Sequence, residues 1–470
     1  MLRPCRITSQ MSKNIDFDLT CISKEIDMLQ RNSAEINWSP KNNLNFKLII
    51  PPTVYPPRED TDLMANRIIS LGSGSGKKML EIGCGSGALS ILGSYLGWDV
   101  QCCDVNPYAA IATRGNLALN SLSAEVKEGG LGPEKFPFEN IYDLIIWNLP
   151  YIQPDEVNSL LGPMEEASFV DNDIIGLGER TLTYITKANL LKPSGQVLLL
   201  SKKSKFNNSN LSSRIWDELE FKDGEKIFLS CHWKPFNSAP KLHLDKTKST
   251  NDDLLNHDTV GSHVYTSLQT SGRGRRSRVW KSFDGSYAGS WVVHNGPDVN
   301  PGLLSLAGGL AVFNAIGSSS ISVKWPNDLY IGDRKLCGIL VEGTSIGTKT
   351  KAILGVGINL RTDPKQNERF ASLDEIKTFE IEEFDSMLNL ELSSLIEKGE
   401  NLPPININEI ISSMQEKIIM FGKPQYDGKI YDEFRLNENG ELLLGKYVLN
   451  DGDDVLWVQS SRSASTGSGF

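Results

Sequence analysis

Apolar segments of strand length alternate with segments of helix length in the first half of the chain. Strands are expected at 77–83, 99–105 and 142–150, helices at 88–97 and 107–122, and a further helix and strand around 186–201. The polar stretch 203–214 is expected to be a surface loop. Strands that alternate with helices favour βαβ units and a parallel sheet. The front half is therefore predicted to be an α/β domain.

Beyond about Lys241 the strand-length segments follow one another more closely. They lie at 263–270, 287–295, 322–326, 328–332, 335–343 and 351–360, with a helix around 303–317. Gly332 and Asp333 between two of them indicate a hairpin. This spacing predicts an α+β domain with a mixed or antiparallel sheet backed by helices. The strand-rich piece after Gly422 predicts a small barrel-like module.

These patterns divide the chain into five parts. They are an N-terminal extension (1–40), an α/β domain (41–235), an α+β domain (240–420), a small C-terminal domain (421–460) and a disordered tail (461–470). The first residues are basic but have no apolar core, so a secretory signal is not expected. They weakly resemble a transit peptide, and Met11 is the preferred start.

Charge and cysteine content narrow the class of protein. The chain has 470 residues and a formal net charge of −10, which argues against a general binder of nucleic acid or anionic membranes. No apolar run reaches the roughly 18 residues of a membrane span. The seven cysteines are odd in number and have no C-x-x-C spacing. Reduced thiols in a cytoplasmic protein are therefore expected, without a metal site.

A glycine-rich turn follows the first strand of the α/β pattern. Glycines in such a turn let a ligand approach the backbone at the start of the next helix. Asp104 ends the following strand, where an acidic side chain can accept hydrogen bonds from both ribose hydroxyls. Taken alone, the turn fits a dinucleotide, S-adenosylmethionine or a purely structural role. Its residues are Glu81, Gly83, Cys84, Gly85, Ser86 and Gly87.

The end of the strand expected at 142–150 and the residue after it read Asn148, Leu149, Pro150 and Tyr151. This tetrapeptide resembles the Asn-Pro-Pro-Tyr motif of methyltransferases that modify a planar nitrogen. A side-chain amide and a backbone carbonyl can accept the two hydrogens of a target –NH₂, while the Tyr ring packs on the amide plane. Such positioning supplies most of the catalysis in a methyl transfer.

Residues from about 45 to 203 resemble the HemK-like family, specifically the short release-factor glutamine methyltransferases. The resemblance includes Val54–Thr61, in which Glu59, Asp60 and Thr61 are implied to lie over the cofactor. It implies a seven-stranded Rossmann-like sheet, S-adenosylmethionine as cofactor, a peptide-chain release factor as acceptor and a small zinc-protein helper. Leu149 departs from the family, which has Pro there. A non-catalytic cofactor-binding scaffold and a nucleic-acid N-methyltransferase are the alternatives.

Polar and basic motifs are concentrated in the second half. The loop around Arg273, Gly274 and Arg275 is strongly basic in an acidic chain. Arginine forks bind phosphate oxygens, and glycine lets a loop fold over them. Lys324 at a strand end suits a reacting phosphoryl or acyl group. Short polar contacts for a neutral heterocycle, and a stacking face, come from Ser249, Thr250, Gln269 and Trp280.

In order along 241–459, these motifs resemble biotin protein ligase. The resemblance implies that biotin and Mg-ATP form biotinyl-5′-adenylate, and that a lysine of biotin carboxyl carrier protein then takes the biotinyl group. It implies an SH3-like C-terminal domain, and that Arg273–Arg275 close over the adenylate. By resemblance Ser249, Thr250, Asn251 and Gln269 line the biotin pocket, Trp280 meets adenine, Lys324 contacts carboxylate and phosphate, and Asn327 serves the phosphate region. Gly338 and Asn359 are expected to be structural. A lipoate or octanoate ligase is the alternative.

Overall fold

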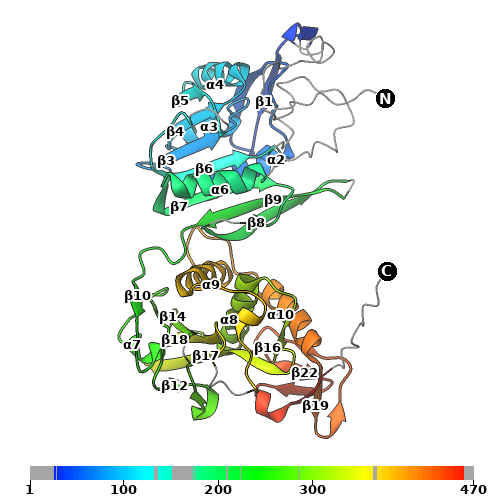
Figure 1. Ribbon diagram of the computed structural model, residues 1–470. Helices are drawn as coiled ribbons and strands as arrows, with labels where there is room; N and C mark the ends of the chain where they lie inside the picture. Colours follow the sequence, from blue (N-terminus) through cyan, green and yellow to red (C-terminus); the bar gives the residue numbers. More distant parts are fainter. Residues whose placement is uncertain are drawn as a thin grey trace, which may run out of the picture. The chain divides into compact units, whose positions relative to one another are not determined.

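The computed structural model describes residues 26–27, 29–131, 136–150, 173, 175–207, 210–222, 224–283, 285–363 and 368–459. The expected start at Met11, the motif residue Tyr151 and the expected tail at 461–470 lie outside this part of the chain. The fold has two compact units. Unit 1 comprises the residues up to Lys234 together with Glu400–Pro403, and unit 2 comprises the remainder (Figure 1).

A seven-stranded sheet forms the centre of unit 1, as predicted. Its strand order is β5-β4-β3-β6-β7-β9-β8; β5 to β7 are parallel, and the last two strands are antiparallel to their neighbours. The strands are β3 (Lys78–Ile82), β4 (Asp99–Asp104), β5 (Glu125–Glu128), β6 (Tyr142–Asn148), β7 (Leu191–Ser201), β8 (Ser212–Glu220) and β9 (Lys226–Trp233). The helices are α2 (Glu59–Ser70), α3 (Ala88–Tyr95), α4 (Pro107–Leu119) and α6 (Leu177–Lys187).

Alternation along the strands sends side chains into two separate cores. Met79 packs with α2, α3 and α4, whereas its neighbour Leu80 packs with α6 on the other face. Leu144 and Ile145 divide in the same way. This period of two is what a strand imposes when both faces of a sheet are covered. The carboxyl ends of β3, β4 and β6 therefore meet at one edge between two packed layers.

Two strand pairs of unit 1 are absent from the sequence prediction. The hairpin β1 (Ala34–Trp38) and β2 (Phe46–Ile50) packs through Trp38, Phe46 and Leu48 onto the α2–α4 side. Its first strand lies inside the range expected as an N-terminal extension. The expected surface loop at 203–214 buries Phe206 and Leu211, and it already enters β8 at Ser212.

Unit 2 is built on a second seven-stranded sheet, of mixed type as predicted. The order is β10-β11-β14-β18-β17-β16-β15, in which β10 and β11 are parallel and all other pairs antiparallel. Ile331 pairs with Arg334 across the turn at Gly332 and Asp333, which confirms the predicted hairpin. The strands are β10 (Lys241–Leu244), β11 (His263–Thr266), β14 (Ser286–Gly296), β15 (Ile321–Lys324), β16 (Asp328–Ile331), β17 (Arg334–Ile346) and β18 (Lys349–Asn359).

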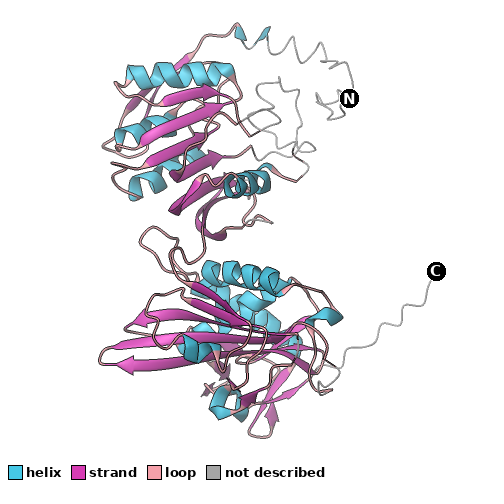
Figure 2. Cartoon of the chain, turned by 60° about the vertical axis from the view of Figure 1, so that its left-hand side comes forward, coloured by secondary structure: helices cyan, strands magenta, loops and turns pink. Residues whose placement is uncertain are grey.

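Three long helices of unit 2 share one core with this sheet (Figure 2). They are α8 (Pro301–Ile316), α9 (Ile381–Ile396) and α10 (Ile407–Phe421). The shorter elements around the sheet are α7 (Thr250–Asp253), β12 (Gly272–Arg273), η1 (Arg275–Ser277), β13 (Val279–Trp280) and η2 (Leu373–Glu375). Within the described residues, none of the helices has the length and apolar character that crossing a membrane requires.

The C-terminal part of unit 2 consists of short antiparallel strands, as expected after Gly422. One three-stranded sheet has the order β20-β19-β24 and the other β21-β22-β23. Whether they form an SH3-like barrel stays a prediction. The elements are β19 (Lys423–Tyr426), β20 (Lys429–Ile430), β21 (Arg435–Leu436), β22 (Leu442–Leu444), β23 (Tyr447–Leu449), η3 (Gly452–Asp454) and β24 (Leu456–Val458).

Candidate functional sites

A pocket of about 210 Å³ lies at the carboxyl ends of β3, β4 and β6. Most of the residues predicted for the first site line it. Two of them, Glu59 and Gly87, do not line it. Glu59 is exposed in the first turn of α2, and Gly87 caps the start of α3. The predicted residues that line the pocket are Asp60, Thr61, Glu81, Gly83, Cys84, Gly85, Ser86, Asp104, Asn148, Leu149 and Pro150.

The glycine turn is held in a conformation that other residues rarely adopt. Gly83, Gly85 and Gly87 have φ values of 68°, 53° and 81°. A Cβ on Gly83 would lie 2.7 Å from the indole nitrogen of Trp147, and one on Gly87 would lie 2.8 Å from Thr113. The turn therefore needs glycine for its backbone and for the space beside it.

Carboxylates brace this turn against the sheet. One oxygen of Asp104 accepts a hydrogen bond from the Gly85 amide at 2.8 Å, and the other accepts from the Asn106 amide at 2.9 Å. Burial raises the pKa of Asp104, although these two hydrogen bonds lower it. Glu81 is buried and accepts a hydrogen bond from the Ser90 hydroxyl on α3. Burial also raises the pKa of Glu81 well above its ordinary value.

The amide of Asn148 is oriented by a neighbouring carboxylate. Its Nδ2 donates to Asp60 Oδ2 at 2.9 Å, and the Tyr55 hydroxyl donates to the same oxygen at 3.0 Å. An ionised carboxylate can only accept, so the amide nitrogen must face Asp60. Asn148 Oδ1 is then buried with no hydrogen-bond partner among the described residues. The site thus presents a fixed acceptor at the end of β6.

Leu149 is held by a bond that proline could not make. Its side chain is buried, and its backbone N–H donates to the Leu200 carbonyl at 3.1 Å. Proline has no N–H and fixes the chain through its ring instead. The departure at Leu149 therefore replaces one constraint on the loop by another.

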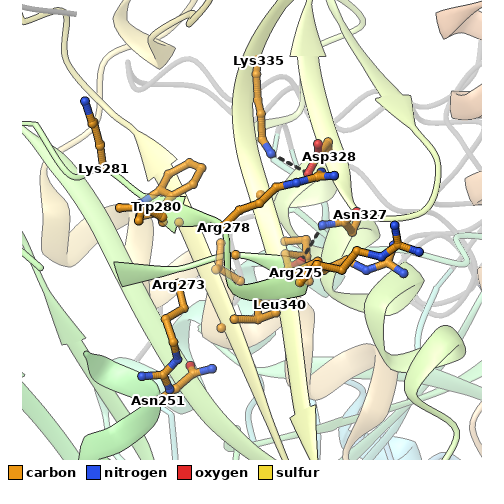
Figure 3. Close-up of a pocket in the computed structure, with 18 of the residues that line it drawn as sticks. Asn251, Arg273, Arg275, Arg278, Trp280, Lys281, Asn327, Asp328, Lys335 and Leu340 are labelled. Carbon is orange, nitrogen blue, oxygen red and sulfur yellow. Dashed lines mark hydrogen bonds and ion pairs between the residues drawn. The ribbon is translucent and has the colours of Figure 1, made fainter. Parts of the chain in front are cut away.

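A second cavity, of about 590 Å³, lies in unit 2 and is lined by all ten residues predicted for the second site. In Figure 3, Arg273 and Asn251 lie together at one end, whereas Lys335 and Asp328 lie at the other. The ten residues come from sequence segments that the sheet of unit 2 brings together. They are Ser249, Thr250, Asn251, Gln269, Arg273, Gly274, Arg275, Trp280, Lys324 and Asn327.

The polar end of this cavity is built on α7. Ser249 caps that short helix by accepting from the Asp252 amide, and the Thr250 amide donates to Gln269 Oε1 at 2.8 Å. Asn251 Nδ2 donates to a carboxylate oxygen of Glu342 at 2.6 Å. Backbone and carboxylate partners thus fix the orientation of both amide side chains before any ligand binds.

Carboxylates from three segments hold the arginine-rich loop. Arg273 pairs with Asp252 of α7 at 2.6 Å and with Glu342 of β17 at 3.1 Å, and the hydrogen bonds that it donates to these carboxylates raise its pKa. At the other end of the loop, Arg276 pairs with Asp451 and Asp453 around η3, and Arg278 pairs with Asp453 at 2.5 Å.

Arg275 is the most loosely held of these arginines. Its Nη2 lies 3.8 Å from Asp451 Oδ1. Sequence reasoning did not predict Asp451 or Asp453, although an acidic run opposite in sign to the loop was a usable signal. Both aspartates line the cavity. The loop therefore carries its positive charge into the site already balanced by the C-terminal part of unit 2.

Lys324 differs from the arginines in having no such partner. It lies at the end of β15 on the cavity wall and forms no ion pair with any described residue. Lys335, by contrast, pairs with Asp328 at 2.7 Å. An unpaired ammonium group in a concave site is suited to stabilise negative charge on a bound ligand.

Trp280 lies over two glycines of neighbouring strands. Gly338 and Gly357 are directly opposite in the β17–β18 register, and a Cβ on Gly357 would lie 2.6 Å from the indole ring. A structural role was expected for Asn359, and its amide nitrogen fits that role, because Nδ2 donates to the Ala371 carbonyl at 3.0 Å. Its Oδ1 is buried, lacks a partner among the described residues, and belongs to a residue that lines the cavity.

Asn327 is anchored within the sheet while lining the cavity. Its Nδ2 donates to the Ile339 carbonyl at 2.9 Å, and its own carbonyl accepts from the Ile339 amide at 2.8 Å. The remaining amide oxygen is the group that this residue can offer to a ligand.

Comparison with known proteins places two families on this chain. Residues 243–359 match the biotin/lipoate A/B protein ligase family, and residues 59–163 match the methyltransferase small domain. The bifunctional ligase/repressor BirA of Escherichia coli is 38% identical over 124 residues, which cover 25% of this chain and 38% of that protein. The biotin–[acetyl-CoA-carboxylase] ligase of Paracoccus denitrificans is 33% identical over 131 residues, covering 26% and 55%.

A biotin protein ligase from Aquifex aeolicus, solved in complex with biotin and ATP, is 25% identical and covers 47% of this chain and 99% of its own, with a TM-score of 0.37. The chain spans 38% and 55% of the length of the two curated relatives. The predicted fusion is nevertheless confirmed at the level of families. This chain joins a methyltransferase small domain to a domain of the biotin/lipoate A/B protein ligase family.

Proposed function

We propose that unit 2 is an ATP-dependent ligase that attaches biotin to biotin carboxyl carrier protein. The observation that carries the proposal is the convergence of ten motif residues on one cavity in a domain of this ligase family. In the first step a biotin carboxylate oxygen attacks the α-phosphorus of ATP, forming biotinyl-5′-AMP and releasing pyrophosphate. In the second, a carrier lysine amine attacks the acyl carbon and loses a proton, and AMP leaves with the bonding electrons.

Charge in the cavity supports this assignment of roles. Lys324, which has no ion-pair partner among the described residues, would stabilise the negative charge that builds up between carboxylate and α-phosphate. Arg275, held by Asp451 only at 3.8 Å, is the arginine most easily turned toward a phosphate. Arg273 and Gly274 would complete the loop over the adenylate.

The two ends of the cavity suit the two ends of the adenylate. Ser249, Thr250, Asn251 and Gln269 would receive the biotin ring. Trp280 would meet the adenine, and Asn359 Oδ1 would accept from its amino group.

The Mg²⁺ ion in this proposal would enter with ATP. Among the described residues no group of three histidine, cysteine or acidic side chains is placed to hold a metal ion. Mg²⁺ commonly binds substrate phosphates with few protein ligands. Asn327 is the residue assigned to this region.

The test is incubation of the protein with ATP, Mg²⁺, labelled biotin and a biotin carrier domain. Label on the carrier that requires ATP would support the proposal, and competition by unlabelled biotin but not by lipoate or octanoate would exclude the alternative ligases. Transfer of lipoate in place of biotin, or an unlabelled carrier with a folded protein, would contradict it.

For unit 1 we propose S-adenosylmethionine-dependent methylation of a glutamine side chain in a peptide-chain release factor. The observation that carries it is the buried oxygen of Asn148, which lacks a hydrogen-bond partner among the described residues while the amide nitrogen donates to Asp60. The glycine turn and Asp104 fit the cofactor, which when bound supplies the methyl group. Asn148 Oδ1 and the Leu149 carbonyl would accept the two amide hydrogens, so that the nitrogen lone pair faces the methyl carbon.

Two measurements separate this proposal from its alternatives. Calorimetry should detect binding of S-adenosylmethionine, and tritium from labelled cofactor should appear on a release factor. Binding without transfer would favour a scaffold, and label on nucleic acid would favour the other methyltransferase class. A flat titration at millimolar cofactor would contradict every cofactor-dependent role.

A small zinc-protein helper for unit 1 is part of the proposal. The surface that supports it is an exposed apolar patch formed by Val105, just before α4, and by Tyr108 and Ile111 of α4, which are 54%, 40% and 62% exposed. It adjoins β5, which is an edge strand of the sheet among the described residues, and an edge strand can accept a further strand. Co-expression with such a helper should raise the yield of unit 1, and Ile111→Glu should abolish the effect.

A cytoplasmic location is also proposed. The cysteines of the described residues that are free are Cys84, Cys102, Cys103, Cys231 and Cys337, which accords with a reducing compartment.

A further inference from the structure

Ser290 on β14 is fully buried and does not line the cavity, yet its hydroxyl contacts two residues assigned to the biotin pocket. Its Oγ lies 2.7 Å from Thr250 Oγ1 and 2.5 Å from Asn251 Oδ1. A serine hydroxyl has one proton to donate. Which neighbour receives that proton decides what Thr250 can offer to a ligand.

The orientation of the Asn251 amide decides the question. Its Nδ2 lies 2.6 Å from Glu342 Oε2, and an ionised carboxylate can only accept. The amide oxygen therefore faces Ser290, and an amide oxygen likewise can only accept. Gly355 leaves room for this arrangement, because a Cβ there would lie 2.6 Å from Asn251 Oδ1. The proton of Ser290 must go to Asn251.

Thr250 then has to donate in its turn. With its proton on Asn251, the Ser290 hydroxyl receives the Thr250 proton. Gln269 Oε1 does not need that proton, because the Thr250 amide already donates to it at 2.8 Å, closer than the hydroxyl at 3.1 Å. The donors run in one direction: Thr250 to Ser290, Ser290 to Asn251, and Asn251 to Glu342.

We propose that Ser290 is a positioning residue that turns the Thr250 hydroxyl into an acceptor toward the ligand, so that the pocket selects a ring N–H over a ring oxygen. The inference rests on the proposed ligase function and extends it to specificity. The ureido ring of biotin carries such N–H groups. Replacing one N–H by oxygen places two acceptors face to face, which a site built for a hydrogen bond rejects strongly.

The experiment compares biotin with its two cyclic carbamate analogues, in each of which one ring N–H is replaced by oxygen. For the wild-type chain, kinetics of adenylate formation should show at least one analogue rejected by about a hundredfold in kcat/KM. In Ser290→Ala the Thr250 proton is free to turn toward the ligand. KM for biotin should rise about tenfold, while the rejected analogue improves and the ratio falls below about ten. KM for ATP should not change.

Ser262→Ala is the matched control, since this buried hydroxyl has no hydrogen-bond partner among the described residues. It should leave both the biotin KM and the analogue ratio as in the wild type. An equal loss for biotin and analogue in Ser290→Ala would mean a merely structural role and would overturn the inference.

A second variant covers the case in which Ser290→Ala does not fold. Glu342→Ala removes the carboxylate that orients Asn251. Because Glu342 is partly exposed, this variant should fold, and it should also lower the ratio of kcat/KM between biotin and the rejected analogue. An unchanged ratio in a folded Glu342→Ala protein would overturn the proton order. If the wild-type chain activates neither biotin nor an analogue, the proposed ligase function fails first and this inference falls with it.

Discussion

In the methyltransferase pocket the carboxylate of Asp104 is held by backbone N–H groups, whereas in the ligase cavity arginines are held by carboxylates from other segments. Asp104 accepts from the amides of Gly85 and Asn106. Arg278, by contrast, pairs with Asp453, which lies 175 residues further along the chain. Asp104 is thus held by backbone groups that follow two adjacent strands, and the arginines by side chains that meet only after the unit has folded.

This difference matches what each site is proposed to bind. Backbone hydrogen bonds at a strand end hold a cradle of fixed shape, as a cofactor common to many targets requires. Ion pairs between partly exposed side chains contribute little free energy and are exchanged readily. The carboxylates around the arginine loop can thus give way to phosphate oxygens. One site is thus preshaped, and the other is charge-balanced until its ligand binds.

The largest predicted effect is at Lys324, a cation of the ligase cavity that forms no ion pair with any described residue. Lys324→Ala should slow adenylate formation about a thousandfold, about 4 kcal/mol. The reason is that the variant loses the ammonium group proposed to stabilise the negative charge between carboxylate and α-phosphate. Pyrophosphate release from ATP and biotin measures it. The control Lys349→Ala removes an exposed lysine of β18 and should keep the wild-type rate. A wild-type rate of adenylate formation in Lys324→Ala would contradict a special role for the cation that lacks an ion-pair partner.

A smaller effect, on the stability of the ligase unit, is expected at the buried carboxylate of Asp385. Asp385 is fully buried, with Lys241 at 2.6 Å, His263 at 2.7 Å and the Tyr287 hydroxyl at 2.6 Å. Burial alone would raise the pKa of Asp385, but the hydrogen bond and charge of His263 and the charge of Lys241 outweigh it, so the pKa is lowered. Asp385→Asn should cost about 3 kcal/mol of stability at neutral pH.

The sign of its pH dependence follows from that shift. Since the folded pKa of Asp385 lies below its ordinary value of 3.8, its contribution is complete above that value and is lost as the pH falls through the folded pKa. Urea unfolding should show wild type and Asp385→Asn converging in acid. Asp432→Asn, which removes an exposed partner of Lys423, should unfold as wild type does at neutral pH. A constant difference between wild type and Asp385→Asn at every pH would contradict the charge argument.

In the methyltransferase unit the oriented amide should matter for transfer and not for cofactor binding. Asn148→Ala should slow methyl transfer about a hundredfold, because the acceptor that positions the target nitrogen is lost. The calorimetric Kd for S-adenosylmethionine should stay within about twofold. Asn140→Ala, which removes a donor to Gln101 near the opposite end of β6, serves as control. Equal losses in binding and transfer would mean that Asn148 only supports the pocket.

The smallest effect is expected at the departure from the family motif. Leu149→Pro removes the hydrogen bond to the Leu200 carbonyl and restores the ring that fixes φ, so the two changes should nearly cancel. Methyl transfer should change by no more than about threefold in a tritium assay. A loss of tenfold or more would show that the N–H of Leu149 sets the loop in a way that proline does not.

The ligase site could be predicted from motifs because its residues lie at strand ends and in turns that a sheet brings together. Motifs could not reveal Ser290, a serine in a largely apolar strand, because its role depends on Asn251 and Glu342 on other elements. Asp451 and Asp453 were missed although their acidic run, opposite in sign to the arginine loop, was a usable signal. In the fold, β8 was missed because it is an edge strand with polar residues. For α9, the spacing of Phe384, Leu388 and Leu392 carried an unused helical signal.

The glycine pair beneath Trp280 sets how closely the indole ring can approach the sheet. Gly338 and Gly357 face each other on adjacent strands, and the indole occupies the volume that two methyl groups would fill. A single methyl returned at position 357 would push the ring away from the sheet and narrow the cavity by the same amount. The pair is therefore the place at which a substitution would change the size of the cavity without removing any of its polar side chains.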